Sequence, residues 1–142
     1  MKLLAIRVLK SLIGYEYIPY IKLLAASFIS QKRRKSANYD YLTAKVIKKA
    51  LDSSSICVDI GCHHGIILGI MMKYAPQGKF FAFEPLPISY EYLIKQFDLP
   101  NVKIHNIALS DQKGTANFNY VVNRPAYSGL KKRQYPTSNE KV

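Results

Sequence analysis

The chain has 142 residues, 49% of them apolar, which is enough for one domain with a core and excludes both a disordered chain and a pair of domains. The net charge of +12 is uneven, because residues 1–50 hold 11 Lys and Arg against two acidic residues and so carry +9, whereas residues 51–142 carry +3. A basic N-terminal third favours anionic partners such as a membrane surface, nucleic acid or an acidic polymer.

The cysteine pattern and the hydropathy indicate a cytoplasmic protein. Cys57 and Cys62 lie in one short segment and form no C-x-x-C pair, which fits a reducing compartment. Arg7 and Lys10 interrupt the first apolar stretch before the core of a secretory signal can form. No apolar run reaches the roughly 18 residues that a membrane-spanning helix needs.

Residues 1–36 are expected to form a basic helical arm. Apolar residues recur at helical spacing over residues 1–13, and a second helical stretch over residues 20–29 leads into the basic cluster at residues 32–35. The favoured interpretation is a helical extension packed on the domain. The alternative is an amphipathic arm in peripheral contact with the inner face of an anionic membrane. A nucleic-acid surface is not favoured, because no aromatic residues interleave with the basic cluster.

The rest of the chain alternates between predicted helices and strands. A helix should end at Leu51, with its N-cap among Ser36, Asn38 and Asp40. Apolar residues 56–60 then predict a strand buried on both faces, as in a parallel sheet. The further expected elements are a helix over residues 64–74, a strand over 79–83, a helix over 88–97, a strand over 102–109, and an alternating strand with Ala116, Phe118, Tyr120 and Val122 on one face.

This alternation predicts an α/β fold with a right-handed, doubly wound parallel sheet. Three core strands and one extra strand are readable, so the sheet is expected to be incomplete and to leave the edge beside its first strand unpaired. In such sheets, ligands bind beyond the carboxyl ends of the strands. We therefore expect one crevice to gather Asp59, Gly61, Gly65, Glu84 and residues 108–110.

The residues of this crevice suit S-adenosylmethionine better than a dinucleotide. Glu84, 19 residues after Gly65, can accept hydrogen bonds from both hydroxyls of a ribose, and Gly61 and Gly65 let the backbone approach a ligand closely. Asp59 would repel a diphosphate but would stabilise an ammonium and a sulfonium. The spacing G-x-x-x-G differs from the dinucleotide fingerprint, and no P-loop G-K-[ST] follows. The alternative is that Asp59 only caps the turn and Glu84 is a solvated strand end.

Three blocks resemble the FkbM family of S-adenosylmethionine-dependent methyltransferases in order and spacing, across roughly residues 42–130. They are Val58-Asp-Ile-Gly61, Phe81-Ala-Phe-Glu-Pro85 and Asn106-Ile-Ala-Leu-Ser-Asp111. The resemblance implies a Rossmann-like class I methyltransferase fold and methyl transfer to an oxygen, often on sugars or secondary metabolites. It also implies cofactor contacts: Asp59 and Gly61 near the methionine end, Glu84 on the ribose, and Ala108, Leu109 and Ser110 beside the adenine.

The chain departs from the family pattern at Cys62-His63, where Ala-Asn is common, and the resemblance covers only the cofactor-binding half. We therefore expect an arm over residues 1–36, a partial cofactor-binding domain over 37–130 and a flexible basic tail over 131–142. His63 and His64 are expected to be turn residues, with a substrate-facing base as the alternative. No metal site is predicted, because no Cys, His and Asp set has metal-ligand spacing.

Three functions remain open at this point. The first is an O-methyltransferase acting on a small-molecule or glycan acceptor, with a general base that the sequence does not identify. The second is a non-catalytic remnant that binds the cofactor weakly or not at all. The third is a membrane-surface or assembly protein that acts through its basic arm. In each case an oligomer through the unpaired sheet edge is an expected option.

Overall fold

The computed structural model describes residues 14–26 and 31–132. The predicted helix over residues 1–13 lies outside this part, as do residues 27–29 of the second predicted helix and most of the predicted tail. The elements in chain order are η1 (Tyr15–Tyr17), α2 (Ile18–Ala26), α3 (Gln31–Ala50), β1 (Ile56–Ile60), α4 (Ile66–Tyr74), β2 (Lys79–Phe83), α5 (Pro87–Gln96), β3 (Val102–His105) and η2 (Pro125–Tyr127).

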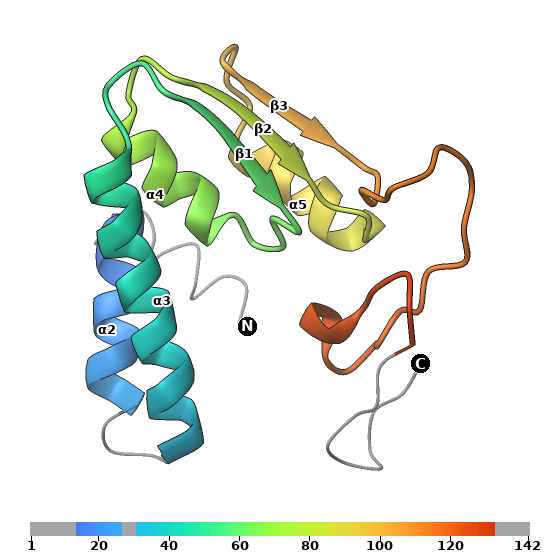
Figure 1. Ribbon diagram of the computed structural model, residues 1–142, viewed down its shortest axis with the longest axis horizontal. Helices are drawn as coiled ribbons and strands as arrows, with labels where there is room; N and C mark the ends of the chain where they lie inside the picture. Colours follow the sequence, from blue (N-terminus) through green and yellow to red (C-terminus); the bar gives the residue numbers. More distant parts are fainter. Residues whose placement is uncertain (1–13, 27–30, 133–142) are drawn as a thin grey trace.

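The centre of the fold is a three-stranded parallel sheet in the order β1-β2-β3 (Figure 1). Cys57 pairs with Phe80, and Ala82 pairs with Ile104, so each strand is in register with the next. The connections β1-α4-β2 and β2-α5-β3 are the expected crossover units. The structure therefore confirms an α/β fold with a partial parallel sheet and an N-terminal helical extension.

Helices α4 and α5 both cover the same face of this sheet (Figure 1). The core between them contains Cys57, Phe80 and Ala82 from the strands and Leu68, Leu93 and Phe97 from the helical side. The opposite face is open among the described residues, where Ile56, Val58 and Ile60 are 70%, 54% and 66% exposed. The prediction that the first strand is buried on both faces, in a sheet wound on both sides, is thus wrong for this part of the chain.

The third strand ends at His105 rather than at residue 109. β2 ends at Phe83, which pairs with His105, so the residues after His105 have no neighbouring strand to pair with in the part of the chain that the structure describes. The side-chain amide of Asn106 instead donates to the carbonyls of Glu84 and Pro85, at 2.8 and 3.1 Å. These bonds turn the chain away from the sheet and shorten the predicted strand.

The predicted strand over residues 116–122 is also not formed. Val122, predicted to lie on the apolar face of this strand, is 58% exposed, whereas its neighbour Val121 is fully buried. The alternation of apolar residues therefore does not correspond to one face of a sheet. An isolated antiparallel bridge joins Asn119 to Gly129, and the Ser128 hydroxyl accepts the Val121 N–H at 3.0 Å. The segment forms a loop that curls back near the ends of the strands (Figure 1).

Helices α2 and α3 form an antiparallel hairpin beside the sheet (Figure 1). α3 begins at Gln31, so the expected N-caps Ser36, Asn38 and Asp40 lie inside the helix. The helix starts early because its Lys and Arg residues are good helix formers and because Asp40 forms an ion pair with Lys22 of α2 instead of capping. The expected boundary after residue 36 falls within this helix.

The described beginning of the N-terminal extension packs on the domain. The ring of Tyr15 lies 5.7 Å from that of Phe97 and against Gly69 of α4, and the Glu16 carboxylate pairs with Lys73 at 3.4 Å. This packing agrees with the favoured interpretation of the arm. Within the described ranges, none of the helices has the length and hydropathy that crossing a bilayer would require.

Candidate functional site

The turn after β1 is held in a conformation that favours glycine. Gly61, His63 and Gly65 have φ angles of 77°, 49° and 69°, and a positive φ costs an L-residue roughly 1–2 kcal/mol. The N–H groups of Gly61 and Cys62 both donate to the carbonyl of Phe83, at 2.8 and 3.2 Å. The turn is therefore fixed across the carboxyl ends of β1 and β2.

The two glycines of the turn have different surroundings. A Cβ at Gly61 would meet no atom within 4 Å, so this residue faces open space. A Cβ at Gly65 would overlap the ring of Phe97 and lie 2.9 Å from Leu93 Cδ2. Gly61 is thus the position where a ligand can approach the backbone, whereas Gly65 lets the start of α4 pack on the α5 side of the core.

Glu84, directly after β2, is fixed by two backbone donors. Its Oε2 accepts the N–H of His63 at 2.7 Å, and its Oε1 accepts the N–H of Leu86 at 2.9 Å. Glu84 is only 3% exposed, which excludes the solvated strand end considered from the sequence. A carboxylate has about four acceptor positions, so each oxygen retains one for a further donor.

Asp59, in β1, is a buried carboxylate whose negative charge is only partly compensated by its surroundings. Burial raises its pKa, and the charge of Glu84 adds to this, while the Cys62 thiol and the Leu68 N–H in the first turn of α4 act in the opposite direction. Its Oδ2 has no hydrogen-bond partner in the part of the chain that the structure describes. A nearby positive charge would therefore stabilise the ionised form, which fits the cationic ligand predicted from the sequence.

Aromatic and thiol groups pack around the turn. The rings of His63 and His64 lie 3.9 Å apart, and that of His64 lies 5.7 Å from Tyr92. Tyr15 approaches the same region, and burial, with smaller contributions from Tyr92 and Cys62, raises its pKa to about 12. Across residues 14–26 and 31–132, no cluster of three or more His, Cys, Asp or Glu is placed to hold a metal ion.

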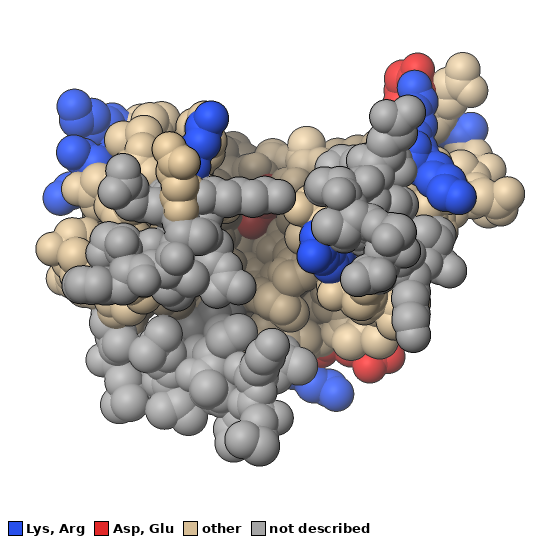
Figure 2. All heavy atoms as spheres, turned by 90° about the horizontal axis from the view of Figure 1, so that it is seen from below, with Lys and Arg blue, Asp and Glu red and all other residues tan. Residues whose placement is uncertain are grey.

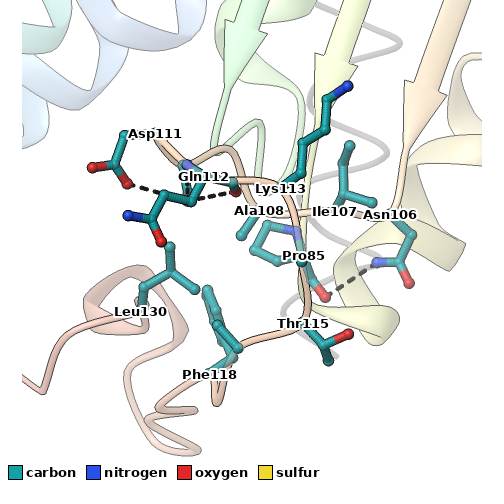
Figure 3. Close-up of a pocket in the computed structure, with 13 residues that line it drawn as sticks. Pro85, Asn106, Ile107, Ala108, Asp111, Gln112, Lys113, Thr115, Phe118 and Leu130 are labelled. Carbon is teal, nitrogen blue, oxygen red and sulfur yellow. Dashed lines mark hydrogen bonds between the residues drawn. The ribbon is translucent and has the colours of Figure 1, made fainter.

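Three cavities follow one another along the carboxyl ends of the strands. One of about 440 Å³ lies between residues 106–116 and Leu130, with Phe118 and Leu130 on one side of it (Figure 3). The next, of about 290 Å³, shares Pro85, Ala108 and Phe118 with the first and reaches Gly61. The third, of about 200 Å³, is lined by residues 61–64 and by residues of α2 and α3. Gly61 is common to the second and the third.

Figure 2 shows the same region as a hollow in the surface, to the right of the N-terminal helices α2 and α3. Of the predicted site residues, Gly61, Ala108, Leu109 and Ser110 line these cavities. Asp59 and Glu84 lie behind the cavity walls, and Gly65 lies in the packing between α4 and α5.

Sequence reasoning missed the contribution of the N-terminal hairpin to this region. Pro19, Lys22 and Asp40 line the third cavity together with the turn. In the sequence Asp40 was considered only as an N-cap, and no local pattern relates these three residues to the turn at residues 61–65. Only the tertiary packing of α2 and α3 reveals the connection.

The sequence is similar to a curated methyltransferase, which indicates a relationship with methyltransferases. It is 34% identical over 84 residues to methyltransferase sdnD of Sordaria araneosa, which covers 56% of this chain and 32% of that protein. The chain thus spans about a third of the length of this relative. No family model matches, so membership of the FkbM family stays a prediction.

The fold is similar to parts of two solved structures. A SAM-dependent methyltransferase from Aquifex aeolicus is 20% identical with a TM-score of 0.37, over 54% of this chain and 43% of that one. The plantazolicin methyltransferase BpumL, in complex with SAH, is 18% identical with a TM-score of 0.39, over 78% of this chain and 46% of that one.

Proposed function

We propose that this chain binds S-adenosylmethionine and forms the cofactor-binding part of a methyltransferase. The observation that carries the proposal is the pair of buried carboxylates, Asp59 and Glu84, held behind the open Gly61 turn where two cavities meet. A dinucleotide would bring a diphosphate toward these two negative charges. A sulfonium ligand brings a positive charge, which the desolvated Asp59 favours.

The proposed cofactor has three chemical parts, and we assign each to a different part of the cleft or its wall. The adenine is assigned to the wall with Ala108, Leu109 and Ser110, where Phe118 and Leu130 supply apolar surface. The ribose hydroxyls are assigned to the remaining acceptor positions of Glu84. The methionine end is assigned to the side of Gly61 next to Asp59, which stabilises the ammonium and the sulfonium through its negative charge.

Glu84 is too buried for a ribose to reach it in the present conformation, so binding requires the turn to shift. His63 covers this carboxylate with its N–H and holds a positive φ. The strain of roughly 1–2 kcal/mol at such a residue lowers the cost of the shift. The residue that now fixes Glu84 is therefore the one that we expect to move when a ligand enters.

The bound cofactor would supply a methyl group activated by the sulfonium: an acceptor oxygen forms the new C–O bond as the C–S bond breaks, the sulfur keeps the electron pair, and a base takes the acceptor proton. The part of this chain is to hold the ligand in line and match its charge. FkbM-type O-methylation of a sugar or secondary-metabolite hydroxyl is the specific reaction that we propose, supported by the three blocks around Asp59, Glu84 and Ala108. Because the chain spans 32% of its curated relative, activity of the whole protein belongs to the proposal.

The β1 edge offers a way to extend the cofactor-binding part. β1 has a neighbour on one side only in the described sheet, and its residues carry no Lys or Pro that would block pairing. We propose that a further strand, from a partner or a second copy, pairs there.

The decisive experiment is isothermal titration calorimetry with S-adenosylmethionine and its demethylated product, S-adenosylhomocysteine. Both should bind, and Glu84→Gln should weaken both by about tenfold or more, because a charge-assisted hydrogen bond contributes about 1.5–3 kcal/mol. Glu91→Gln, which removes the same charge from an exposed position on α5, is the matched control and should bind as the wild type does.

The outcomes separate the functions considered from the sequence. Absence of binding heat and of any thermal shift with either ligand would refute the proposal. Binding without methyl transfer to any tested sugar or hydroxylated metabolite would favour the non-catalytic remnant. Equal effects of the Glu84 and Glu91 substitutions would remove Glu84 from the ligand site.

A further inference from the structure

An ion pair from the N-terminal hairpin faces the glycine turn. Lys22 Nζ in α2 and Asp40 Oδ2 in α3 lie 3.3 Å apart, and each side chain is 45% exposed. Both residues line the cavity of about 200 Å³ that Gly61, Cys62 and His63 close from the other side. A positive and a negative group are thus held next to each other at the wall of a small cavity whose remaining lining is largely apolar.

The size of this cavity limits what it can hold. Whole drug-sized ligands occupy pockets of about 300–1,000 Å³, so a space of about 200 Å³ suits a small head group. The cavity is not isolated, because Gly61 also lines the next one along the strand ends. A ligand that extends over Gly61 can therefore place one end in this cavity and the rest in the cleft.

The charges of the pair match those of an α-amino acid. The α-ammonium of such a zwitterion can bind Asp40 while its carboxylate binds Lys22, so both charged groups of the ligand find a partner at once. Asp59 does not line this cavity, so its charge acts from behind the turn and a direct contact has to come from another carboxylate. The exposed ion pair contributes little to stability, and a ligand can separate it at small cost.

We infer that Lys22 and Asp40 bind the amino-acid end of the ligand, with Lys22 on its carboxylate and Asp40 on its ammonium. This inference rests on the proposed function, since it assigns one end of the proposed cofactor. It gives the N-terminal hairpin a role in recognition: α2 and α3 close the cleft at the end opposite to Ala108 and distinguish ligands that carry a zwitterion from nucleosides that do not.

The test compares two ligands by calorimetry on the full chain. S-adenosylhomocysteine carries the zwitterion, and 5′-methylthioadenosine has the same nucleoside thioether without it. Lys22→Met and Asp40→Asn should each weaken S-adenosylhomocysteine by about tenfold and change 5′-methylthioadenosine by less than about twofold. Lys49→Met removes one positive charge from an exposed position of α3 and should leave both affinities unchanged.

A charge reversal distinguishes recognition from a structural link between the helices. The double variant Lys22→Asp with Asp40→Lys keeps opposite charges between α2 and α3 but places them against the wrong ends of the zwitterion. Loss of S-adenosylhomocysteine binding in this variant, with 5′-methylthioadenosine retained and the helical circular dichroism unchanged, supports the inference. Restored binding of both ligands, or equal weakening of both in the single variants, would overturn it while leaving the proposed function standing. Failure of the wild type to bind either ligand would overturn both.

Discussion

Replacing each glycine of the turn by alanine tests the packing at the start of α4. Both positions have a positive φ, so each substitution should cost about 1–2 kcal/mol of unfolding free energy from backbone strain. At Gly65 the new Cβ also overlaps Phe97, and overpacking of this kind typically adds about 1–3 kcal/mol. Gly61 has open space, so no second cost applies. We therefore expect Gly65→Ala to be the more destabilising change by about 1–3 kcal/mol.

Urea unfolding followed by circular dichroism measures this difference, with the slope of the transition as a check that both variants unfold in the same way. The double variant Gly65→Ala with Phe97→Leu should recover part of the loss, because the smaller side chain removes the overlap with the Phe97 ring while the close contact with Leu93 stays. Equal destabilisation by Gly61→Ala and Gly65→Ala, or no recovery in the double variant, would show that the reasoning on packing is wrong. Gly61→Ala should instead weaken S-adenosylhomocysteine binding, because its methyl group would narrow the passage between the cavities of about 290 and 200 Å³ that Gly61 lines.

Two further predictions concern charge. Folding raises the pKa of Asp59 above its ordinary value of 3.8, so the folded state holds this proton more tightly than the unfolded state does. The unfolding free energy therefore falls as the pH rises from the unfolded pKa to the higher folded pKa. Asp59→Asn should therefore raise the thermal midpoint of the ligand-free chain at pH 7 while weakening cofactor binding; a lowered midpoint in differential scanning fluorimetry would contradict this. Because the hairpin packs on the domain, only the net charge of +12 should attract the chain to an anionic membrane. We therefore expect the chain to sediment with anionic vesicles at low salt and to be released at high salt, which screens the attraction. Salt-resistant sedimentation would instead support an arm that inserts its apolar residues.

The sequence predicted the strands best where neighbouring residues alone define them. β1 and β2 match their predicted bounds because each apolar run is closed by polar or glycine residues that cannot continue it. The end of β3 depends on Asn106, whose amide binds carbonyls of another strand connection. The start of α3 depends on Asp40 meeting Lys22 rather than its own backbone. Neither choice is visible in a local pattern.

The candidate site divides in the same way. The order of strands brings Asp59, Gly61 and Glu84 to one edge of the sheet, and the spacing of the motif predicts this directly. The spacing does not predict how deeply each residue is buried. Glu84 is covered by the backbone of His63, and Gly65 contacts the core instead of a cavity. Such differences arise from side-chain packing between elements that are distant in the sequence.

The open face of β1 has a consequence for the behaviour of the chain in solution. Its three β-branched residues, Ile56, Val58 and Ile60, present a continuous apolar strip to water, and such strips promote coalescence between molecules. The net charge of +12 opposes this, because identical molecules repel one another at long range. Colloidal stability therefore depends on a balance between a short-range attraction and a screened repulsion. Added salt shortens the repulsion but leaves the apolar strip intact, so ionic strength sets how long the chain stays dispersed.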